Sequence, residues 1–580
     1  MGYKQTYEKW INDVNIDKEI KNELLSIKDN EKEIEERFYK DLEFGTGGLR
    51  GIIGAGTNRM NIYTVRRASQ GLAAYIKSNL HKNGKDSVVI AYDSRYKSSE
   101  FALEAAKVFA ANGLKAFLFD ELRPTPELSF AVRHLKAAAG VVVTASHNPP
   151  QYNGYKVYGE DGGQITIDTA NAIIKEINAI MDITSVKTMD KDEALEKGLI
   201  KIIGKEIDDV YIEKLKTLRI NPHITMDSDA DIKIIYTPLH GTGNKLVRRI
   251  LKETGYNDVI VVKEQEMPDP SFSTVKSPNP EEKDAFKLAI EMAEKENADL
   301  IIGTDPDCDR IGVVVKNLKG EYQVLTGNQT GCLLMDYILS GKSEKNQLPK
   351  NGFVVKTIVT TELVKRIAES FNVELIEVLT GFKFIGEKIK ELDDQGDKKY
   401  IFGFEESYGY LAGTFARDKD GVVAAMLIAE MTAYYKAKNM SLYEGLDELY
   451  KKYGYYVEDI NSFTLEGKEG MEKIKNTLKE LRDDKVSKFG KFDVYAVRDY
   501  LVGKRYVIDE NKVQDINLPQ SNVLYYEMAD GSWFCIRPSG TEPKLKLYYG
   551  VSADTLKDSR DKLIDLKECV LSRMEKMLYE

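Results

Sequence analysis

Four short polar segments of the chain carry side chains whose chemical types complement one another. The first, Thr144–Pro150, holds a serine after an apolar run, and the second, Asp305–Arg310, offers three carboxylates. The third, Gly403–Gly409, contains the acceptor Glu405, and the fourth, Arg537–Thr541, combines a guanidinium with two hydroxyls. A nucleophile, ligands for a hard cation, acceptors for sugar hydroxyls and donors for a phosphate together indicate phosphoryl transfer on a phosphosugar.

The aspartates recur at every second position, so a near-extended loop could turn all three toward one point. Asp305, Asp307 and Asp309 lie between the apolar runs 300–302 and 311–315. Mg²⁺ takes oxygen ligands and shares its coordination with phosphate oxygens and water. The glycine and the final glutamate of an EF-hand are both missing, which excludes that kind of calcium site. The remaining alternative to a magnesium site is a solvated acidic turn.

Ser146 is the candidate nucleophile. The hydrolase elbow requires glycines two residues on either side of its serine, but Thr144 and Asn148 stand there. A serine can instead accept a phosphoryl group and pass it on. His147 could reach the substrate or only brace the loop, and an N-cap role stays open for Ser146.

The segment near the C-terminus resembles an anion-binding nest. Arg537, Ser539, Gly540 and Thr541 offer a guanidinium, hydroxyls and backbone amides, which suit a phosphate. An ordinary Pro-Ser-Gly turn has the same composition. Two lysines shortly downstream add positive charge and favour the phosphate interpretation.

The glutamate segment suits sugar hydroxyls, because an ionised Glu405 accepts hydrogen bonds without donating. From its residues alone, it could equally be a solvated acidic turn. Arg310, next to the aspartates, could orient substrate or phosphoserine oxygens. The glycine-rich run 45–51 follows no clear strand, and 341–343 lacks the first glycine of a P-loop, so we expect no nucleotide site.

The elements that must position these segments follow a pattern that occurs three times. In each copy an apolar strand, a polar turn and a helix precede a second strand, and the second strands are 141–143, 300–302 and 400–402. Such alternation predicts three similar α/β domains with mixed, largely parallel sheets. Because ligands bind at the carboxyl ends of strands in such sheets, each domain would supply one loop to a shared central cleft.

The two ends of the chain differ from this pattern. Residues up to about Lys40 have helical apolar spacing and predict two packed helices with a structural role. The region from about residue 453 has short strands and a final helix with an apolar stripe, which predicts a smaller C-terminal α+β domain. The predicted parts are a helical extension (1–44), domain I with the serine loop (45–205), domain II with the aspartate loop (206–325), domain III with the glutamate loop (326–450) and domain IV with the phosphate loop (451–580).

Bulk composition describes an ordinary globular protein of several domains: 580 residues, 42% hydrophobic and 30% charged. A net charge of −10 argues against a general binder of nucleic acid or membrane surfaces, but allows an anionic substrate. No apolar run has membrane-spanning length, and no signal peptide is evident. Four scattered cysteines fit a reducing compartment. We therefore expect a cytoplasmic protein with small-molecule partners, without nucleic acid or membrane.

Taken together, these segments resemble the α-D-phosphohexomutase family, which includes phosphoglucomutases and phosphomannomutases. The resemblance runs from about Gly45 to the C-terminus and adds Gly45–Arg50 and Thr380-Gly381 to the four segments above. The N-terminal extension and Pro149–Lys156 are most similar to the branch that contains phosphoglucomutase/phosphopentomutase proteins.

The resemblance implies four domains around a central cleft and a phosphorylated Ser146. It also implies one Mg²⁺ per active site, held by the phosphate oxygen of Ser146 and by Asp305, Asp307 and Asp309. Arg50, His147 and Lys156 match catalytic positions, with Lys156 or His147 as the acid/base. The substrate-binding positions that it implies are Arg310, Thr380, Gly381, Glu405, Ser407, Lys419, Arg537, Ser539, Gly540 and Thr541.

The implied reaction interconverts glucose 1-phosphate and glucose 6-phosphate through glucose 1,6-bisphosphate, which is both intermediate and activator. A phosphopentomutase acting on ribose or deoxyribose 1-phosphate is the alternative, ahead of a phosphomannomutase, a sugar-bisphosphate synthase or a non-catalytic phosphosugar sensor. The loop Ser407–Tyr410 lacks the histidine of the bacterial phosphomannomutase/phosphoglucomutase branch, which disfavours dual mannose and glucose use. Phe404 adds bulk before Glu405, and pentose activity therefore stays open, as do the oligomeric state (monomer or dimer) and the physiological direction.

Overall fold

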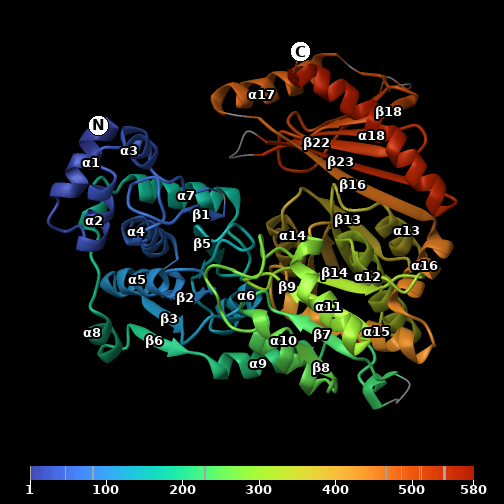
Figure 1. Cartoon of the computed structure of the whole chain (residues 1–580), viewed down its shortest axis with the longest axis horizontal. Helices are drawn as coiled ribbons and strands as arrows, with labels where there is room; N and C mark the ends of the chain where they lie inside the picture. Colours follow the sequence, from blue (N-terminus) through green and yellow to red (C-terminus); the bar gives the residue numbers. More distant parts are fainter. Residues whose placement is uncertain are drawn as a thin grey trace. The chain divides into compact units, whose positions relative to one another are not determined.

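The computed structural model describes residues 2–579 apart from Thr46, 81–83, 227–229, Glu466, Lys485, Asp509, Asn511 and 540–543. The chain divides into two compact units, which are described separately. Unit 1 comprises Met1–Val354 and Gly381–Tyr443, and unit 2 comprises Val355–Thr380 and Glu444–Glu580. Figure 1 shows the elements of both units in chain order.

Three short helices open unit 1, where the sequence predicted two. They are α1 (Tyr3–Asn12), α2 (Lys18–Ser26) and α3 (Glu31–Phe38). Helix α3 is separate because the side chain of Asn30 accepts a hydrogen bond from the Glu33 amide and starts a new helix. The Trp10 ring packs edge-on against Phe38 and Tyr63, which joins these helices to the first α/β layer.

The first sheet of unit 1 has six strands in the order β1-β5-β4-β2-β3-β6. Strand β2 is parallel to β3 and β4, whereas β5 is antiparallel to β4 and β1. Helix α5 packs against β2 and β3, and α6 packs against β2 and β4 (Figure 1). The strands are β1 (Gly48–Ile52), β2 (Ser87–Tyr92), β3 (Lys115–Phe119), β4 (Ala139–Val143), β5 (Tyr152–Gly159) and β6 (Ile200–Ile203). The helices are α4 (Ile62–Asn79), α5 (Ser98–Ala111), α6 (Thr125–His134), α7 (Ile167–Asn178) and α8 (Lys191–Glu196).

The second sheet of unit 1 has five strands in the order β11-β10-β9-β7-β8. Strand β7 is parallel to β8 and β9, and β9 turns back into the antiparallel β10. This turn is the aspartate loop. The strands are β7 (Ile234–Thr237), β8 (Val259–Val261), β9 (Leu300–Thr304), β10 (Ile311–Lys316) and β11 (Tyr322–Leu325). The helices of this region are α9 (Lys205–Lys216), α10 (Gly243–Glu253) and α11 (Lys287–Glu296).

A third sheet has the order β13-β12-β14-β15. Strands β14 and β15 form an antiparallel pair, and the glutamate loop is the turn that joins them. The strands are β12 (Gly352–Thr357), β13 (Glu374–Val378), β14 (Lys399–Glu405) and β15 (Gly409–Ala412). The helices are α12 (Gly327–Glu344), α13 (Leu363–Ser370), α14 (Phe382–Gln395) and α15 (Gly421–Ala437).

The last region, in unit 2, is built on an antiparallel sheet in the order β16-β23-β22-β21-β18-β19-β20, with β17 paired to β18. Its final helix buries the stripe Leu563, Leu566, Val570 and Met574, as the spacing of these residues predicted. The strands are β16 (Tyr455–Thr464), β17 (Lys488–Phe489), β18 (Phe492–Asp499), β19 (Lys504–Val507), β20 (Lys512–Asp515), β21 (Leu524–Met528), β22 (Trp533–Pro538) and β23 (Lys544–Ala553). The helices are α16 (Leu442–Tyr453), α17 (Gly467–Asp483) and α18 (Leu556–Tyr579).

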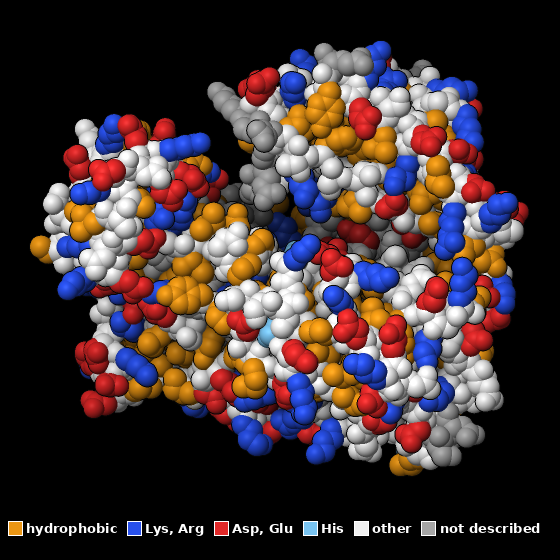
Figure 2. All heavy atoms as spheres, viewed as in Figure 1, with side chains coloured by type: hydrophobic (Ala, Val, Ile, Leu, Met, Phe, Trp, Pro, Cys, Tyr) orange, Lys and Arg blue, Asp and Glu red, His pale blue; other side chains and the backbone are white. Residues whose placement is uncertain are grey.

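The predicted fold class is confirmed: three α/β regions with mixed sheets are followed by an α+β region. Figure 2 shows charged side chains of both signs interspersed over the face in view, as expected for a chain with 30% charged residues. Among the described residues, no helix is both long and apolar enough to cross a membrane.

Candidate active site

The serine loop follows β4 and is held by a buried arginine. Ser146 has a φ of 51°, an uncommon left-handed conformation for a serine. Arg95 donates hydrogen bonds to the carbonyls of Ser146, Pro149 and Tyr152, and its guanidinium lies 3.3 Å from Asp93. These bonds stabilise the turn that presents the serine. Sequence reasoning missed Arg95, although a charged pair directly after a buried strand could have indicated it.

The hydroxyl of Ser146 points at the aspartate loop. Its Oγ donates to Asp305 Oδ2 at 2.6 Å, and His147 Nδ1 lies 3.2 Å from the same Oγ. The serine is only 4% exposed. The structure thus brings together the candidate nucleophile and the carboxylates, which lie far apart in the sequence.

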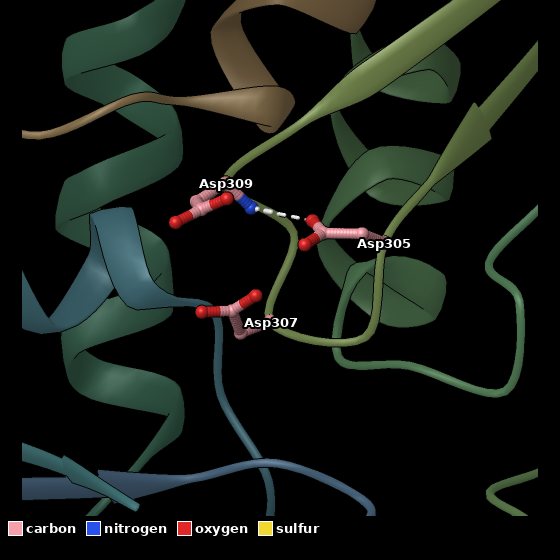
Figure 3. A group of neighbouring side chains, drawn as sticks. All are labelled: Asp305, Asp307 and Asp309. Atoms are coloured by element: carbon pink, nitrogen blue, oxygen red, sulfur yellow. Dashed lines mark hydrogen bonds between the residues drawn. The ribbon is translucent and has the colours of Figure 1, made fainter. Parts of the chain in front are cut away.

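The three aspartates form one buried group on the turn between β9 and β10. Figure 3 shows them on this turn, where the dashed line marks the bond from the Asp309 amide to Asp305 Oδ1, 3.1 Å long. The Arg310 amide donates to the same Oδ1 at 3.0 Å. One ligand atom from each aspartate can be chosen so that all three lie within 4.8 Å of one another. The backbone of the loop therefore gathers the carboxylates as their spacing predicted.

The free oxygens of this group fit a hard divalent cation. Asp307 Oδ1 and Asp309 Oδ1 are buried and have no hydrogen-bond partner among the described residues. A buried carboxylate oxygen without a partner is costly, and a cation would offset that cost. The donor set is all oxygen, which suits Mg²⁺.

Two lysines occupy the other side of the carboxylates. Lys156 Nζ lies 2.7 Å from Asp307 Oδ2 and 3.4 Å from Asp309 Oδ2, and Lys419 Nζ lies 3.1 Å from the latter. Burial opposes the charge of both lysines, but the neighbouring carboxylates outweigh it and raise the pKa of each. Lys419 Nζ also lies 3.0 Å from Asp418 Oδ1. Sequence reasoning did not single out Asp418. Both lysines therefore carry a proton at neutral pH.

His147, unlike the two lysines, has a lowered pKa. Its burial, together with the positive charges of Arg310 and Arg50, lowers the pKa of His147 well below its usual value. The imidazole is therefore neutral at pH 7 and able to accept a proton. Arg50, on β1, donates to Asn148 Oδ1 at 3.0 Å.

Glu405 ends β14 and faces the backbone that precedes α14. Its Oε1 accepts the Gly381 amide at 2.9 Å, and the φ of 121° at Gly381 is a conformation that favours glycine. Burial raises the pKa of Glu405 to about 7, although the charge of Lys419 opposes this rise. Ser407 lies in the following turn and is half-buried. Glu405 therefore changes charge near neutral pH.

Arg310 is engaged by a residue that sequence reasoning did not single out. Its guanidinium forms an ion pair with Glu281, and Nε has no hydrogen-bond partner among the described residues. Glu281 raises the pKa of Arg310 against the effect of burial, so the guanidinium is charged. No short motif around Glu281 signals this contact.

The structure settles the place of Phe404, whose effect on sugar size the sequence left open. Its side chain is fully buried, and the ring lies against Gly331 of α12 and near Tyr410. Successive residues of a strand point to opposite faces, so Phe404 points into the core while Glu405 points to the site. Its bulk therefore carries no information about the size of the sugar.

The remaining predicted residues belong to unit 2. Arg537 lies near the end of β22, 3.5 Å from the hydroxyl of Tyr548, and Ser539 follows the strand. Thr380 also belongs to unit 2, whereas Gly540 and Thr541 lie outside the described residues. The structure thus assembles the serine, aspartate and glutamate loops within unit 1.

Comparison with known proteins gives matches along most of the chain. Four family models match in order, described as phosphoglucomutase/phosphomannomutase alpha/beta/alpha domains I (residues 41–183), II (209–320) and III (326–453) and C-terminal domain (496–566). A phosphoglucomutase of Staphylococcus haemolyticus is 40% identical over 90% of this chain and 92% of its own length. A phosphoglucomutase of Staphylococcus aureus is 37% identical over 92% and 94%. The crystal structure of parafusin, a phosphoglucomutase from Paramecium, in its open form, superposes with a TM-score of 0.68 at 17% identity, over 93% of this chain and 96% of that one.

Proposed function

Because this chain belongs to the α-D-phosphohexomutase family, in its phosphoglucomutase branch, we propose that it interconverts glucose 1-phosphate and glucose 6-phosphate. The observation that carries the proposal is the 2.6 Å contact between Ser146 Oγ and Asp305 beside two further buried carboxylates. Relatives that are 37–40% identical over most of the chain carry the name phosphoglucomutase, which does not favour the phosphopentomutase alternative.

The reaction begins with a phosphorylated Ser146. Its phosphoryl group moves to the free 6-hydroxyl oxygen of glucose 1-phosphate, the bond from phosphorus to Ser146 Oγ breaks, and the hydroxyl proton passes to a base. Ser146 Oγ takes up a proton from the acid. The bisphosphate then turns over, Ser146 Oγ gives up that proton and bonds to the phosphorus at position 1, the bond from this phosphorus to O1 breaks, and O1 takes up a proton to give glucose 6-phosphate. Neutral His147, 3.2 Å from Oγ, suits the base, and charged Lys156 suits the acid. Such transfers depend chiefly on positioning and charge neutralisation.

The metal site in this proposal is formed by Asp305, Asp307 and Asp309. Mg²⁺ bound there would offset negative charge on the transferring phosphoryl group. Asp307 Oδ1 and Asp309 Oδ1, which are buried without a hydrogen-bond partner in the described part of the chain, support this assignment. Arg310 adds a positive charge next to the same loop.

The substrate contacts are proposed as follows. Glu405 and Ser407 bind sugar hydroxyls, since both lie at the turn between β14 and β15, and Glu405 is close to charged Lys419. Arg50 is proposed to be catalytic. The other residues proposed to bind substrate are Arg310, Thr380, Gly381, Lys419, Arg537, Ser539, Gly540 and Thr541. The division of the chain into five parts also belongs to this proposal. So do the role of glucose 1,6-bisphosphate as activator and a cytoplasmic location.

The test is an assay of the full-length protein with Mg²⁺ and a trace of glucose 1,6-bisphosphate. Glucose 1-phosphate should be converted faster than ribose 1-phosphate, without steady release of inorganic phosphate. Ser146→Ala should abolish turnover and leave phosphosugar binding in place. Ser340→Ala is the matched control and should keep full turnover. It removes a hydroxyl of α12 that, in the part of the chain that the structure describes, bonds only to the carbonyl of Tyr337. Faster conversion of ribose 1-phosphate, or turnover by Ser146→Ala, would contradict the proposal.

A further inference from the structure

The two carboxylate oxygens of Asp307 have different surroundings. Oδ2 accepts hydrogen bonds from Thr125 Oγ1 at 3.0 Å and from Lys156 Nζ at 2.7 Å. Oδ1 is buried and has no partner among the described residues. A carboxylate held by one oxygen in this way presents the other in a fixed direction, toward the space where a metal ion would bind.

Thr125 contacts Asp307 at two points. Besides the hydroxyl contact, the Thr125 amide donates to the Asp307 carbonyl at 2.9 Å. Thr125 is the first residue of α6 and is fully buried, and 182 residues separate it from Asp307. Prolines at positions 124 and 126 fix the backbone on both sides of it. The hydroxyl therefore stands on a rigid helix start.

Helix α6 is itself fastened to its surroundings. Arg123, just before the helix, donates to both carboxylate oxygens of Asp208 on α9, at 2.8 and 3.2 Å. Further along α6, Ser129 Oγ donates to the Gly162 carbonyl at 2.6 Å. The Gly162 contact and the packing of α6 against β2 and β4 limit movement of Thr125 relative to the first sheet, which also carries Ser146.

Lys156 alone would not fix the direction of Asp307. Its ammonium group is a compact charge on a flexible stem, and it is shared between Asp307 and Asp309. A threonine hydroxyl donates one hydrogen bond from a β-branched side chain with few rotamers. Thr125 therefore supplies directional control that the lysine lacks.

We infer that Thr125 is a positioning residue, whose hydroxyl turns Asp307 so that Oδ1 faces the metal ion. This inference rests on the proposed metal site. Groups that orient metal ligands typically change metal affinity by 10- to 100-fold when they are removed. The hydroxyl of Thr125 also joins the aspartate loop to the part of the chain that presents Ser146.

The test measures metal binding directly on the metal-stripped full-length protein. Mn²⁺ binding is followed by electron paramagnetic resonance, and Mg²⁺ binding by calorimetry, without any sugar. Thr125→Val removes the hydroxyl at nearly constant size and keeps the amide, and should weaken binding roughly tenfold. Thr125→Ser keeps the hydroxyl and should bind within about twofold of the unmodified protein. Thr432→Val is the matched control, because within the described residues this buried hydroxyl of α15 bonds only to the Ile428 carbonyl.

The outcomes separate this inference from the proposed function. Unchanged metal affinity in Thr125→Val would overturn the role of Thr125 while the metal site stands. Equal weakening in Thr125→Val and Thr432→Val would overturn it as well, because the effect would then come from lost packing. Metal binding by neither the unmodified protein nor any variant would overturn the metal site itself. If melting curves show that Thr125→Val does not fold, the pair Thr125→Ala and Thr125→Ser repeats the comparison.

Discussion

Ser146 Oγ lies 2.6 Å from Asp305 Oδ2, although 159 residues separate the two along the chain. Each residue stands directly beyond a fully buried strand, β4 for the serine loop and β9 for the aspartate. The carboxyl ends of strands from two sheets therefore meet at one point, where the hydroxyl of Ser146 lies beside a cluster of carboxylates. This relationship underlies the predictions below.

Loss of one metal ligand should weaken metal binding far more than it weakens the fold. Asp309→Asn removes a negative charge whose Oδ1 has no hydrogen-bond partner among the described residues, and should reduce Mg²⁺ affinity by more than tenfold. Calorimetry on the metal-stripped protein measures this change. Asp258→Asn, at an exposed carboxylate, is the control. Equal Mg²⁺ affinity in Asp309→Asn and the unmodified protein would mean that the cluster does not hold the metal.

Binding of glucose 1-phosphate should weaken as the pH falls through about 7. Burial raises the pKa of Glu405 to about 7, so below this pH the carboxyl gains a proton and becomes a poorer acceptor for sugar hydroxyls. If only the ionised form binds, KM at pH 6 should be about tenfold above its value at high pH. Initial rates at pH 6 to 8.5 measure the change.

The control for this pH dependence is Glu405→Gln. Its KM should be higher at pH 8 and should retain only the pH dependence that comes from the phosphate of the substrate. A KM profile of Glu405→Gln that superposes on that of the unmodified protein would exclude Glu405 as the titrating group.

Glu127 should limit stability at high pH. It is fully buried on α6, neither of its oxygens has a hydrogen-bond partner among the described residues, and burial together with the charge of Asp208 raises its pKa well above the usual value. Above about pH 4.3 the unfolded chain loses this proton while the folded protein keeps it, so stability falls as the pH rises toward the folded-state pKa.

Glu127→Gln removes this ionisation and should raise the free energy of unfolding at pH 8 by about 1–3 kcal/mol, with a smaller gain at pH 5. Denaturant titrations at both pH values measure it, with the exposed Glu264→Gln as control. A gain that does not depend on pH would show that Glu127 is ionised in the folded protein.

Phe404 should matter for stability and not for sugar choice. Phe404→Ala should lower the free energy of unfolding by about 3–5 kcal/mol, because the ring fills the space against Gly331. The ratio of turnover on glucose 1-phosphate to turnover on ribose 1-phosphate should stay the same. Ser407→Ala should show the converse, with a changed turnover and an unchanged melting temperature. A change in the ratio of the two turnovers in Phe404→Ala would mean that the ring acts on the substrate site, contrary to this prediction.

Residue types and spacing were sufficient to predict the parts of the site that lie close in sequence. The three aspartates and Ser146 could be found because their motifs are local, and periodicity predicted the α/β regions and the stripe on α18. Whether Phe404 points into the core or toward the site could not be predicted, because the sequence pattern of its strand does not show which face of the strand is buried. Asn30 followed by Glu33 could have indicated the third N-terminal helix.

Contacts between segments that lie far apart in the chain could not be predicted from the sequence. A threonine between two prolines is an ordinary helix start, and nothing local links Thr125 to Asp307 across 182 residues. The same holds for Glu281 and Arg310, whose contact depends on how the loop before α11 packs against the aspartate turn. Such partners follow from tertiary packing, which a single sequence does not specify locally.

The central claim is that Ser146 carries the phosphoryl group. The direct measurement is to incubate the full-length protein with Mg²⁺ and glucose 1,6-bisphosphate labelled with ³²P, and to locate the label by peptide mass spectrometry. The account predicts label on Ser146, retained in Ser340→Ala and absent from Ser146→Ala. An unlabelled protein, or label on another residue in both variants, would contradict it.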